Sequence, residues 1–416
     1  MEKLQELVDG MLKQVPRLVL ERLLAEKVKE VGLSVDEAAI SKAAEHIMSG
    51  SDEDLKFGES EDDVTINITD EDIEYVVNTT ERFLNEQLSG VLEKSSDHTA
   101  NLVFKSLSRK WREEYEAQQA DVEGFKERLE HRWGKALGKL RMLLTIAMEW
   151  AQGLYERRLR DSGGKLSHLD DVMLRLHVRA CQVAGEVIVL LENGYADGAM
   201  ARWRTLHEIA TVAAVIAKYG EEIAERYVHY QIVESFSALK AYERNHQALG
   251  FRPLSQAQSK KVRKDYAKII QRFGKPFGGE NGWAAYHLKA RAKERVTFLR
   301  LEEEAGDAMM RSPYKMASYN VHASPKGVYF KLGNLRESSV LLAGMSNAGL
   351  IEPAQHAAVS LSEITLLMIG ESAVFDDLVA SKIIAQLVAK IPLEFAKADR
   401  KLHRDDRKHR KAPPNG

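Results

Sequence analysis

Apolar residues recur along most of the chain with the 3.6-residue period of amphipathic helices. Near the N-terminus Leu20, Leu24 and Val28 follow this spacing, and a more charged helical pattern runs from residue 72 to residue 160. Residues 64–69 instead alternate with period two, which is compatible with one short strand or a β-hairpin near residues 60–70. The pattern as a whole predicts an all-α fold, a multi-helix array or bundle.

Two strongly apolar helices are predicted between Asp171 and Tyr219. The turn between them contains Asn193-Gly194, which is typical of a helix C-terminus, and Asp197 is a candidate N-cap of the second helix. The second helix includes residues 209–217, which are apolar on nearly every side. Because a helix of this kind is usually buried, the fold is expected to centre on a buried helical hairpin.

Each helix of this hairpin also carries a polar stripe. On a helical wheel the stripe of the first helix spans about 60° and that of the second about 100°. The first stripe consists of Arg175, Arg179, Gln182 and Glu186, and the second of Arg204, His207, Glu208 and Thr211. Charged residues on such apolar helices are usually paired, and in some proteins they form a site.

Three explanations of the stripes are open. Both stripes can face water, or they can form a buried network in which every charge is paired, because an orphaned buried charge is strongly destabilising. The pairs then available are Arg204 with Glu186 and Glu208 with Arg179. The third explanation is a site, with Arg175, Arg179 and Glu186 as ligand-binding residues. Since Arg204 precedes Glu208 by four residues, the poorer order for an ion pair along one helix, tertiary partners are expected for both.

The length of 416 residues allows two or three domains. We expect an N-terminal helical appendage at residues 1–130, a helical core domain at 131–392 and a basic, disordered tail at 393–416. The net charge is only −2, but charge is unevenly distributed. Residues 50–74 form an acidic excursion with eleven acidic residues and one lysine, whereas residues 252–295 contain twelve Lys or Arg and three acidic residues.

The basic segment 252–295 is interspersed with aromatic residues, namely Tyr266, Phe273, Phe277 and Trp283. Basic side chains bind phosphates and aromatic rings stack on bases, so this segment and the basic tail are candidates for binding RNA or DNA. The alternative is a solvated helix whose aromatic residues belong to the core. A protein partner or a homo-oligomer is also open, with the acidic excursion docked on this segment in the same chain or in a second subunit.

Cys181 is the single cysteine, which excludes an intrachain disulfide and a Cys-rich zinc site and fits a reducing compartment. It lies in the first apolar helix and is expected to be a small core residue. His177, one turn earlier, is expected to be a core histidine bonded to a backbone carbonyl. The N-terminus lacks a signal-peptide pattern, and the longest apolar run covers about half a bilayer. We therefore predict a cytoplasmic protein without a membrane partner.

The hairpin sequence LLENGYADGAMARWRTLHE, which ends at Glu208, resembles the core signature of a bacterial domain-of-unknown-function family, the one numbered five-six-seven-seven. Arg204 and Glu208 match its Arg-x-x-x-Glu pair, and the segment YNVHAS around His322 resembles its second motif. The resemblance covers residues 140–370. It implies an all-helical fold in which Arg204, Glu208 and His322 group together, but no settled activity. Such families occur in bacterial defence and mobile-element neighbourhoods, which implies a defence-related role.

Two functions are therefore considered, and whether the chain is an enzyme is left open. The first is a binding or sensing component of a bacterial defence system. The alternative is a metal-independent ribonuclease similar in style to the HEPN-type helical toxins. In these an Arg holds the phosphate, and a His that follows after four to six intervening residues moves the 2′-hydroxyl proton.

The candidate catalytic residues for the ribonuclease are Arg204, Glu208, His322 and His207. Arg202 and His207 fit the HEPN spacing, as do Arg404 and His409, but Arg202 and His207 lie about 140° apart on a continuous helix. No metal or cofactor is predicted. A di-metal carboxylate centre needs two Glu-x-x-His motifs, and only the segment 243–246 fits.

Overall fold

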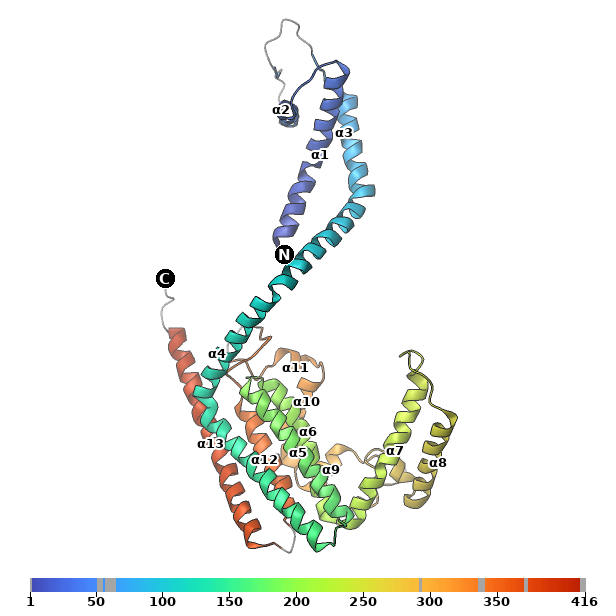
Figure 1. The fold of residues 1–416 in the computed structure, drawn as a ribbon, viewed down its shortest axis with the longest axis vertical. Coiled ribbons are helices and arrows are strands. Elements are labelled where there is room, and N and C mark those ends of the chain that lie inside the picture. The colour runs from blue at the N-terminus through green and yellow to red at the C-terminus, as the bar shows by residue number, and fades with distance from the viewer. Residues whose placement is uncertain are drawn as a thin grey trace. The chain divides into compact units, whose positions relative to one another are not determined.

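The computed structural model describes residues 2–50, 55–56, 65–291, 294–335, 341–369 and 373–411 (Figure 1). Within these ranges every regular element is a helix and none is a strand, which confirms the all-α prediction. The strand expected near residues 60–70 is absent from residues 65–69, whereas residues 60–64 lie outside the described ranges.

Helices follow one another along the whole described chain. They are α1 (Glu2–Glu30), α2 (Glu37–Met48), α3 (Asp70–Arg82), η1 (Phe83–Gln87), α4 (Leu88–Asp161), α5 (His168–Glu192), α6 (Ala196–Tyr219), α7 (Glu221–Asn245), α8 (Gln256–Phe273), η2 (Lys275–Gly278), α9 (Phe298–Ala305), η3 (Ala308–Met310), α10 (Arg311–Val321), α11 (Pro325–Tyr329), α12 (Ile351–Leu367) and α13 (Phe375–Lys411). Among the helices described, none combines the length and the apolar character needed to span a bilayer.

The chain divides into two compact units, residues 1–118 and residues 119–416. In the first unit α1 packs against α2 and α3. α3 begins at a capping box, in which Thr69 and Asp72 each accept a hydrogen bond from the other's backbone N–H. The Asp72 carboxylate also pairs with Lys27 of α1 at 2.8 Å, so the same residue starts α3 and ties it to α1.

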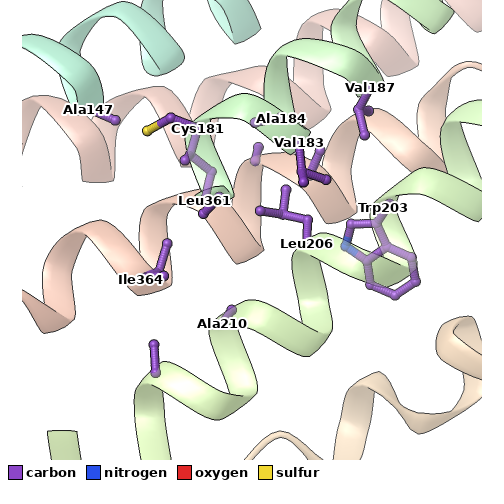
Figure 2. Close-up of a cluster of buried hydrophobic side chains, with 14 of the residues drawn as sticks. Ala147, Cys181, Val183, Ala184, Val187, Trp203, Leu206, Ala210, Leu361 and Ile364 are labelled. Carbon is purple, nitrogen blue, oxygen red and sulfur yellow. The ribbon is translucent and has the colours of Figure 1, made fainter. Parts of the chain in front are cut away.

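The hairpin of α5 and α6 lies at the centre of the second unit. α12 packs against both of its helices, and α9 and α10 pack against α6. Figure 2 shows part of this core, to which Ala147 of α4, Cys181 of α5, Leu206 of α6 and Leu361 of α12 contribute. Leu206 and Leu361 are completely buried. The prediction of a central buried helical hairpin is confirmed.

The turn of this hairpin depends on Gly194. α5 ends at Glu192 with Asn193 as its C-cap, and Gly194 follows with a φ of +73°, a conformation that favours glycine. A Cβ at Gly194 would lie 2.7 Å from the carbonyl oxygen of Ser346 and 2.7 Å from the ring of Phe125. Both the backbone conformation and the close packing therefore require glycine here.

Asp197 does not cap α6, contrary to the prediction. The N-cap position belongs to Tyr195, which makes no side-chain capping bond. The Asp197 carboxylate instead accepts a hydrogen bond from the backbone N–H of Leu332 at 3.1 Å. A tertiary contact has taken the place of the local one.

α13 extends into the segment expected to be a disordered tail. Residues 393–411 are helical, and Phe395, Ala398 and Leu402 are buried along one face. Asp405 pairs with Arg132 of α4 at 2.9 Å. The expectation of disorder is wrong for these residues, because the abundant basic residues flank an apolar stripe that packs on the core. Residues 412–416 lie outside the described ranges.

Candidate functional site

The polar stripe of α5 is largely a solvated helix surface. Arg175 pairs with Asp171 at 2.9 Å, and Arg179 donates to Gln182 at 2.8 Å. Both arginines are exposed, and their partners lie within α5 itself. Arg175 and Arg179 therefore correspond to the first explanation, a stripe that faces water.

One ion pair joins Glu186 of this stripe to α6, and its partner is Arg202. The Arg202 Nε donates to the Glu186 carboxylate, and both side chains are half-buried. Arg204 lies about 200° further round α6, so it points away from Glu186. The sequence suggested two cross-helix pairs, Arg204 with Glu186 and Glu208 with Arg179. This prediction is wrong, because Glu186 pairs with Arg202 and Glu208 pairs with Arg204.

On the other side of α6, Arg204 and Glu208 share a partner on α10. Arg204 Nε lies 3.0 Å from a carboxylate oxygen of Glu208, and the Tyr314 hydroxyl donates to that same oxygen at 2.7 Å. The Arg204 guanidinium carbon lies 4.9 Å from the centre of the Tyr314 ring. Burial and the hydrogen bond to Glu208 raise the pKa of Tyr314 to about 12. Arg204 and Glu208 thus pair with each other despite their order, and also with a tertiary partner.

A second carboxylate lies deeper, between α6, α9 and α10. Glu302 of α9 is completely buried, with one oxygen 3.1 Å from His207 Nε2 and the other accepting from Arg311 at 2.8 Å. The Arg311 guanidinium also lies 5.4 Å from the centre of the Tyr314 ring. We call this set of residues the α6–α10 network: Arg204, His207, Glu208, Glu302, Arg311 and Tyr314.

The α6–α10 network is internally paired. Glu302 has a cationic partner in Arg311, and Glu208 has one in Arg204, so neither carboxylate is left as an orphaned charge. The side chains of Arg204, Glu208 and Arg311 are 24%, 36% and 31% exposed, so water reaches the Arg204–Glu208 pair and one edge of Arg311, whereas Glu302 is completely buried. This arrangement favours the second explanation, a paired network that holds α6, α9 and α10 together.

Three buried polar atoms in and beside this network lack a hydrogen-bond partner among the described residues. They are His207 Nδ1, Thr211 Oγ1 and His356 Nδ1. Trp203 packs between the two imidazoles, with ring centres 5.5 Å from His207 and 4.6 Å from His356. Burial and the nearby His207 lower the pKa of His356 to about 4. Buried polar atoms are normally satisfied, so these three atoms are exceptions among the packed residues around α6.

His322 does not contact the network. It is the exposed C-cap of α10, whereas the α10 residue that reaches Glu208 is Tyr314. His322 follows Tyr314 by eight positions, which correspond to about 12 Å along a helix axis. The structure therefore brings Arg204 and Glu208 together, as the family resemblance implied, and leaves His322 apart from them.

His177 and Cys181 form a hydrogen-bonded chain with Thr365 of α12. The Thr365 hydroxyl donates to the Leu361 carbonyl at 2.7 Å, so it must accept from His177 Nε2, 3.0 Å away. His177 Nδ1 is then an acceptor, 3.7 Å from the sulfur of Cys181. Burial lowers the pKa of His177 to about 4 and raises the pKa of Cys181 to about 12. Both are core residues as predicted, but the partner of His177 is a hydroxyl instead of a backbone carbonyl.

The aromatic residues of the basic segment belong to the core. Phe277 and Trp283 are buried, and Tyr266 and Phe273 are half-buried against the same core. Tyr266 stacks on Phe236 of α7 with ring centres 4.0 Å apart. The rings therefore serve the packing of α7 on α8 and are not presented to solvent for stacking on bases.

The lysines of α8 point to solvent. An exposed face, which we call the α8 lysine face, spans about 100° of the helical wheel. It consists of Lys260, Lys261, Lys264 and Lys268. None of the four has an ion-pair partner among the described residues, whereas Arg263 of the same helix pairs with Glu243 at 2.6 Å.

A pocket of about 570 Å³ opens near the C-terminal end of α6, and its lining includes Lys218, Glu303, Glu304 and Glu363. Lys218 pairs with Glu304 at 2.6 Å. Burial, with the neighbouring Asp307, raises the pKa of Glu363 to about 8. In the part of the chain that the structure describes, no three His, Cys, Asp or Glu side chains are arranged to hold a metal ion.

The hairpin, the α6–α10 network and the α8 lysine face all lie in one stretch of sequence. Residues 170–338 match the model of DUF5677, a family of unknown function. This match confirms the resemblance that the hairpin sequence suggested. α12 and the described part of α13 lie outside the DUF5677 region, so His356 and Thr365 are contributed from beyond it. No curated protein and no solved structure matches the chain.

Proposed function

We propose that this protein is a binding module that holds RNA by its phosphate backbone along the α8 lysine face. The observation that carries the proposal is a row of exposed lysines without carboxylate partners, in a helix whose other face is packed on α7. Lys260 and Lys268 are two turns apart, so the positive charges extend over about 12 Å. Because these lysines have no carboxylate partner among the described residues, they can neutralise phosphates without breaking an ion pair.

The kind of recognition follows from what the face lacks. Because Tyr266, Phe273, Phe277 and Trp283 pack in the core, the contacts available to a nucleic acid come from lysine side chains. Phosphate contacts of this kind are independent of sequence and weaken steeply with salt. The proposal is therefore for binding without sequence preference. The exposed Lys401, Arg404 and Arg407 of α13 offer a second basic surface in the same unit.

The family resemblance supplies the cellular setting of the proposal. A module that binds RNA regardless of sequence suits the sensing component of a bacterial defence system, acting in the cytoplasm. A ribonuclease has less support from the geometry, since Arg202 is engaged by Glu186, His207 is buried beside Glu302, and His322 is remote from Arg204.

The test is RNA binding measured by fluorescence anisotropy at several salt concentrations. We expect the triple variant K260E/K264E/K268E to bind at least about tenfold more weakly, with a salt slope smaller by about 2 to 3. The matched control changes three exposed lysines elsewhere in the second unit, K165E/K382E/K390E, and should bind as the unchanged protein does. Equal loss in both variants, or binding that ignores salt, would contradict the proposal. Stronger binding of single-stranded DNA than of RNA would redirect it to DNA.

A further inference from the structure

The part of α4 in the first unit carries an exposed apolar stripe. It consists of Phe104, Leu107, Trp111 and Tyr115, which are between 50% and 70% exposed. Successive steps of three, four and four residues keep these side chains within about 80° on the helical wheel. Large apolar side chains gathered in this way on a surface mark an interaction site.

The first unit has little core of its own to account for this stripe. Its buried apolar residues in the described ranges are Leu20, Leu24 and Ala44, and they come from α1 and α2. Along α4, residues 88–118 are almost entirely exposed. A helix of this length with an apolar face is stabilised chiefly by packing, so an additional surface is needed to cover it.

The charges around the stripe change sign at its C-terminal end. Residues 98–112 contain no acidic residue, and their basic residues are Lys105, Arg109, Lys110 and Arg112. Immediately after them come Glu113, Glu114 and Glu116. The helix therefore presents a basic segment followed by an acidic one along a single apolar face.

We propose that this stripe is a dimer interface, in which α4 of one copy of the chain packs antiparallel against α4 of a second copy. Antiparallel packing places the basic segment of each helix beside the acidic segment of the other. Parallel packing would instead align like charges, which is unfavourable. A nucleic acid or an anionic membrane fits the basic segment but is repelled by Glu113, Glu114 and Glu116, whereas a second copy suits both segments.

The helical wheel gives the register of this pairing. Lys110 and Glu114 lie together on one flank of the stripe. Pairing Lys110 with Glu114 of the partner subunit puts the two-fold axis beside Arg112. The same register sets Trp111 against Tyr115 of the partner subunit, so aromatic packing and charge pairing agree on one arrangement.

The first experiment is sedimentation equilibrium of the full chain. We expect a monomer–dimer equilibrium, and Trp111→Ala should raise the dimer Kd at least about tenfold, as truncation of a central interface tryptophan does. Leu102→Ala is the matched control, because Leu102 is 55% exposed on the same helix but about 180° from the stripe. A chain that stays monomeric at about 100 µM, or equal effects of both variants, would overturn the proposal.

A charge exchange tests the antiparallel register. The variants K110E and E114K should each fail to dimerise, because each places like charges across the two-fold axis. Mixed together they should form a heterodimer, since both cross-helix pairs are then of opposite sign. Both positions are exposed, so circular dichroism should show unchanged helix content. Continued self-association of either variant, or a mixture that stays monomeric, would refute this register.

Discussion

His207 Nε2 lies 3.1 Å from Glu302 Oε1, and both side chains are almost completely buried. Glu302 is thus the only described α9 carboxylate held in the core, and its second oxygen binds Arg311. Its neighbour Glu303 in the same helix is exposed. Two adjacent glutamates therefore have opposite roles, one in the packing of α6 and α10 on α9 and one in solvent.

Replacing Glu302 by alanine should consequently lower the free energy of unfolding by about 3–5 kcal/mol, because it leaves the buried edge of Arg311 without its counter-charge. Glu303→Ala should change it by less than about 0.5 kcal/mol, as exposed substitutions do. Urea denaturation followed by circular dichroism measures both values. If the two variants were equally stable, the α6–α10 network would not hold the second unit together.

The central hairpin could be predicted from the sequence because the buried positions of a helix are apolar residues that recur at helical spacing. Residues such as Leu206 and Ala210 repeat at helical spacing, and the run through residues 209–217 has no polar side that could face water. The proximity of Arg204 and Glu208 could likewise be predicted from the sequence, since residues four apart share a helix face.

Glu302, Arg311 and Tyr314 could not be predicted in the same way. Glu302 belongs to the run Leu-Glu-Glu-Glu, which reads as a solvated helix face, and nothing local distinguishes it from Glu303. Its burial depends on His207, which is 95 residues away. Contacts of this kind arise from tertiary packing, so a helical wheel of one segment cannot reveal them. The choice of Arg202 rather than Arg204 as the partner of Glu186 has the same origin.

The buried His177 should make stability depend on pH. Its pKa is about 4 in the folded chain and 6.5 ordinarily, so between these values the unfolded chain binds a proton that the folded chain does not. Stability is therefore complete above pH 6.5 and falls as the pH is lowered towards 4, by about 3 kcal/mol for this group. His356 acts in the same direction, since its pKa is also lowered to about 4.

The measurement is urea denaturation at intervals from pH 7 to pH 4. His177→Gln keeps a donor for Thr365 but removes the titration, so the fall in stability across this window should become clearly shallower. His322→Gln is the matched control, because His322 is exposed, and it should reproduce the original slope. An unchanged slope in His177→Gln would show that His177 is not held neutral by burial.

Glu363 should have the opposite pH dependence. Its pKa is raised to about 8 from 4.5, so between these values the folded chain binds a proton that the unfolded chain has lost. The contribution to stability is present below pH 4.5 and is lost as the pH rises through 8. Glu363→Gln cannot ionise, and it should therefore raise the melting temperature at pH 9 relative to the unchanged protein.

At pH 5 the same substitution should have little effect, because Glu363 is then protonated in the folded chain and resembles the amide. Differential scanning fluorimetry at the two pH values measures the difference. Glu352→Gln, an exposed residue on the same helix, should show no such dependence. A melting temperature that Glu363→Gln lowers equally at both pH values would contradict the raised pKa.

A comparison of Gly194 with Gly250 distinguishes two reasons for glycine in the hairpin turn. One is close packing around the residue, and the other is its positive φ. Gly194 follows the C-cap of α5, and Gly250 closes the turn that follows α7. Both have positive φ, +73° and +68°, and in both cases the following residue donates to a carbonyl five residues earlier. A Cβ at Gly250 would meet nothing within 4 Å, whereas at Gly194 it would lie 2.7 Å from Ser346 O and the Phe125 ring. Gly250→Ala should therefore lower the free energy of unfolding by about 1–2 kcal/mol, the strain of a non-glycine residue at positive φ.

Gly194→Ala should lower the free energy of unfolding by about 1–3 kcal/mol more than Gly250→Ala does. The added Cβ forces the backbone at Ser346 or the ring of Phe125 to shift. The Ser346 amide also donates to the Gly194 carbonyl at 2.9 Å, so this shift would weaken the contact that ties residues 341–350 to the turn. Urea denaturation of the two variants gives the costs directly. Equal costs would mean that the turn adapts without strain, and that glycine is required at position 194 by its φ alone.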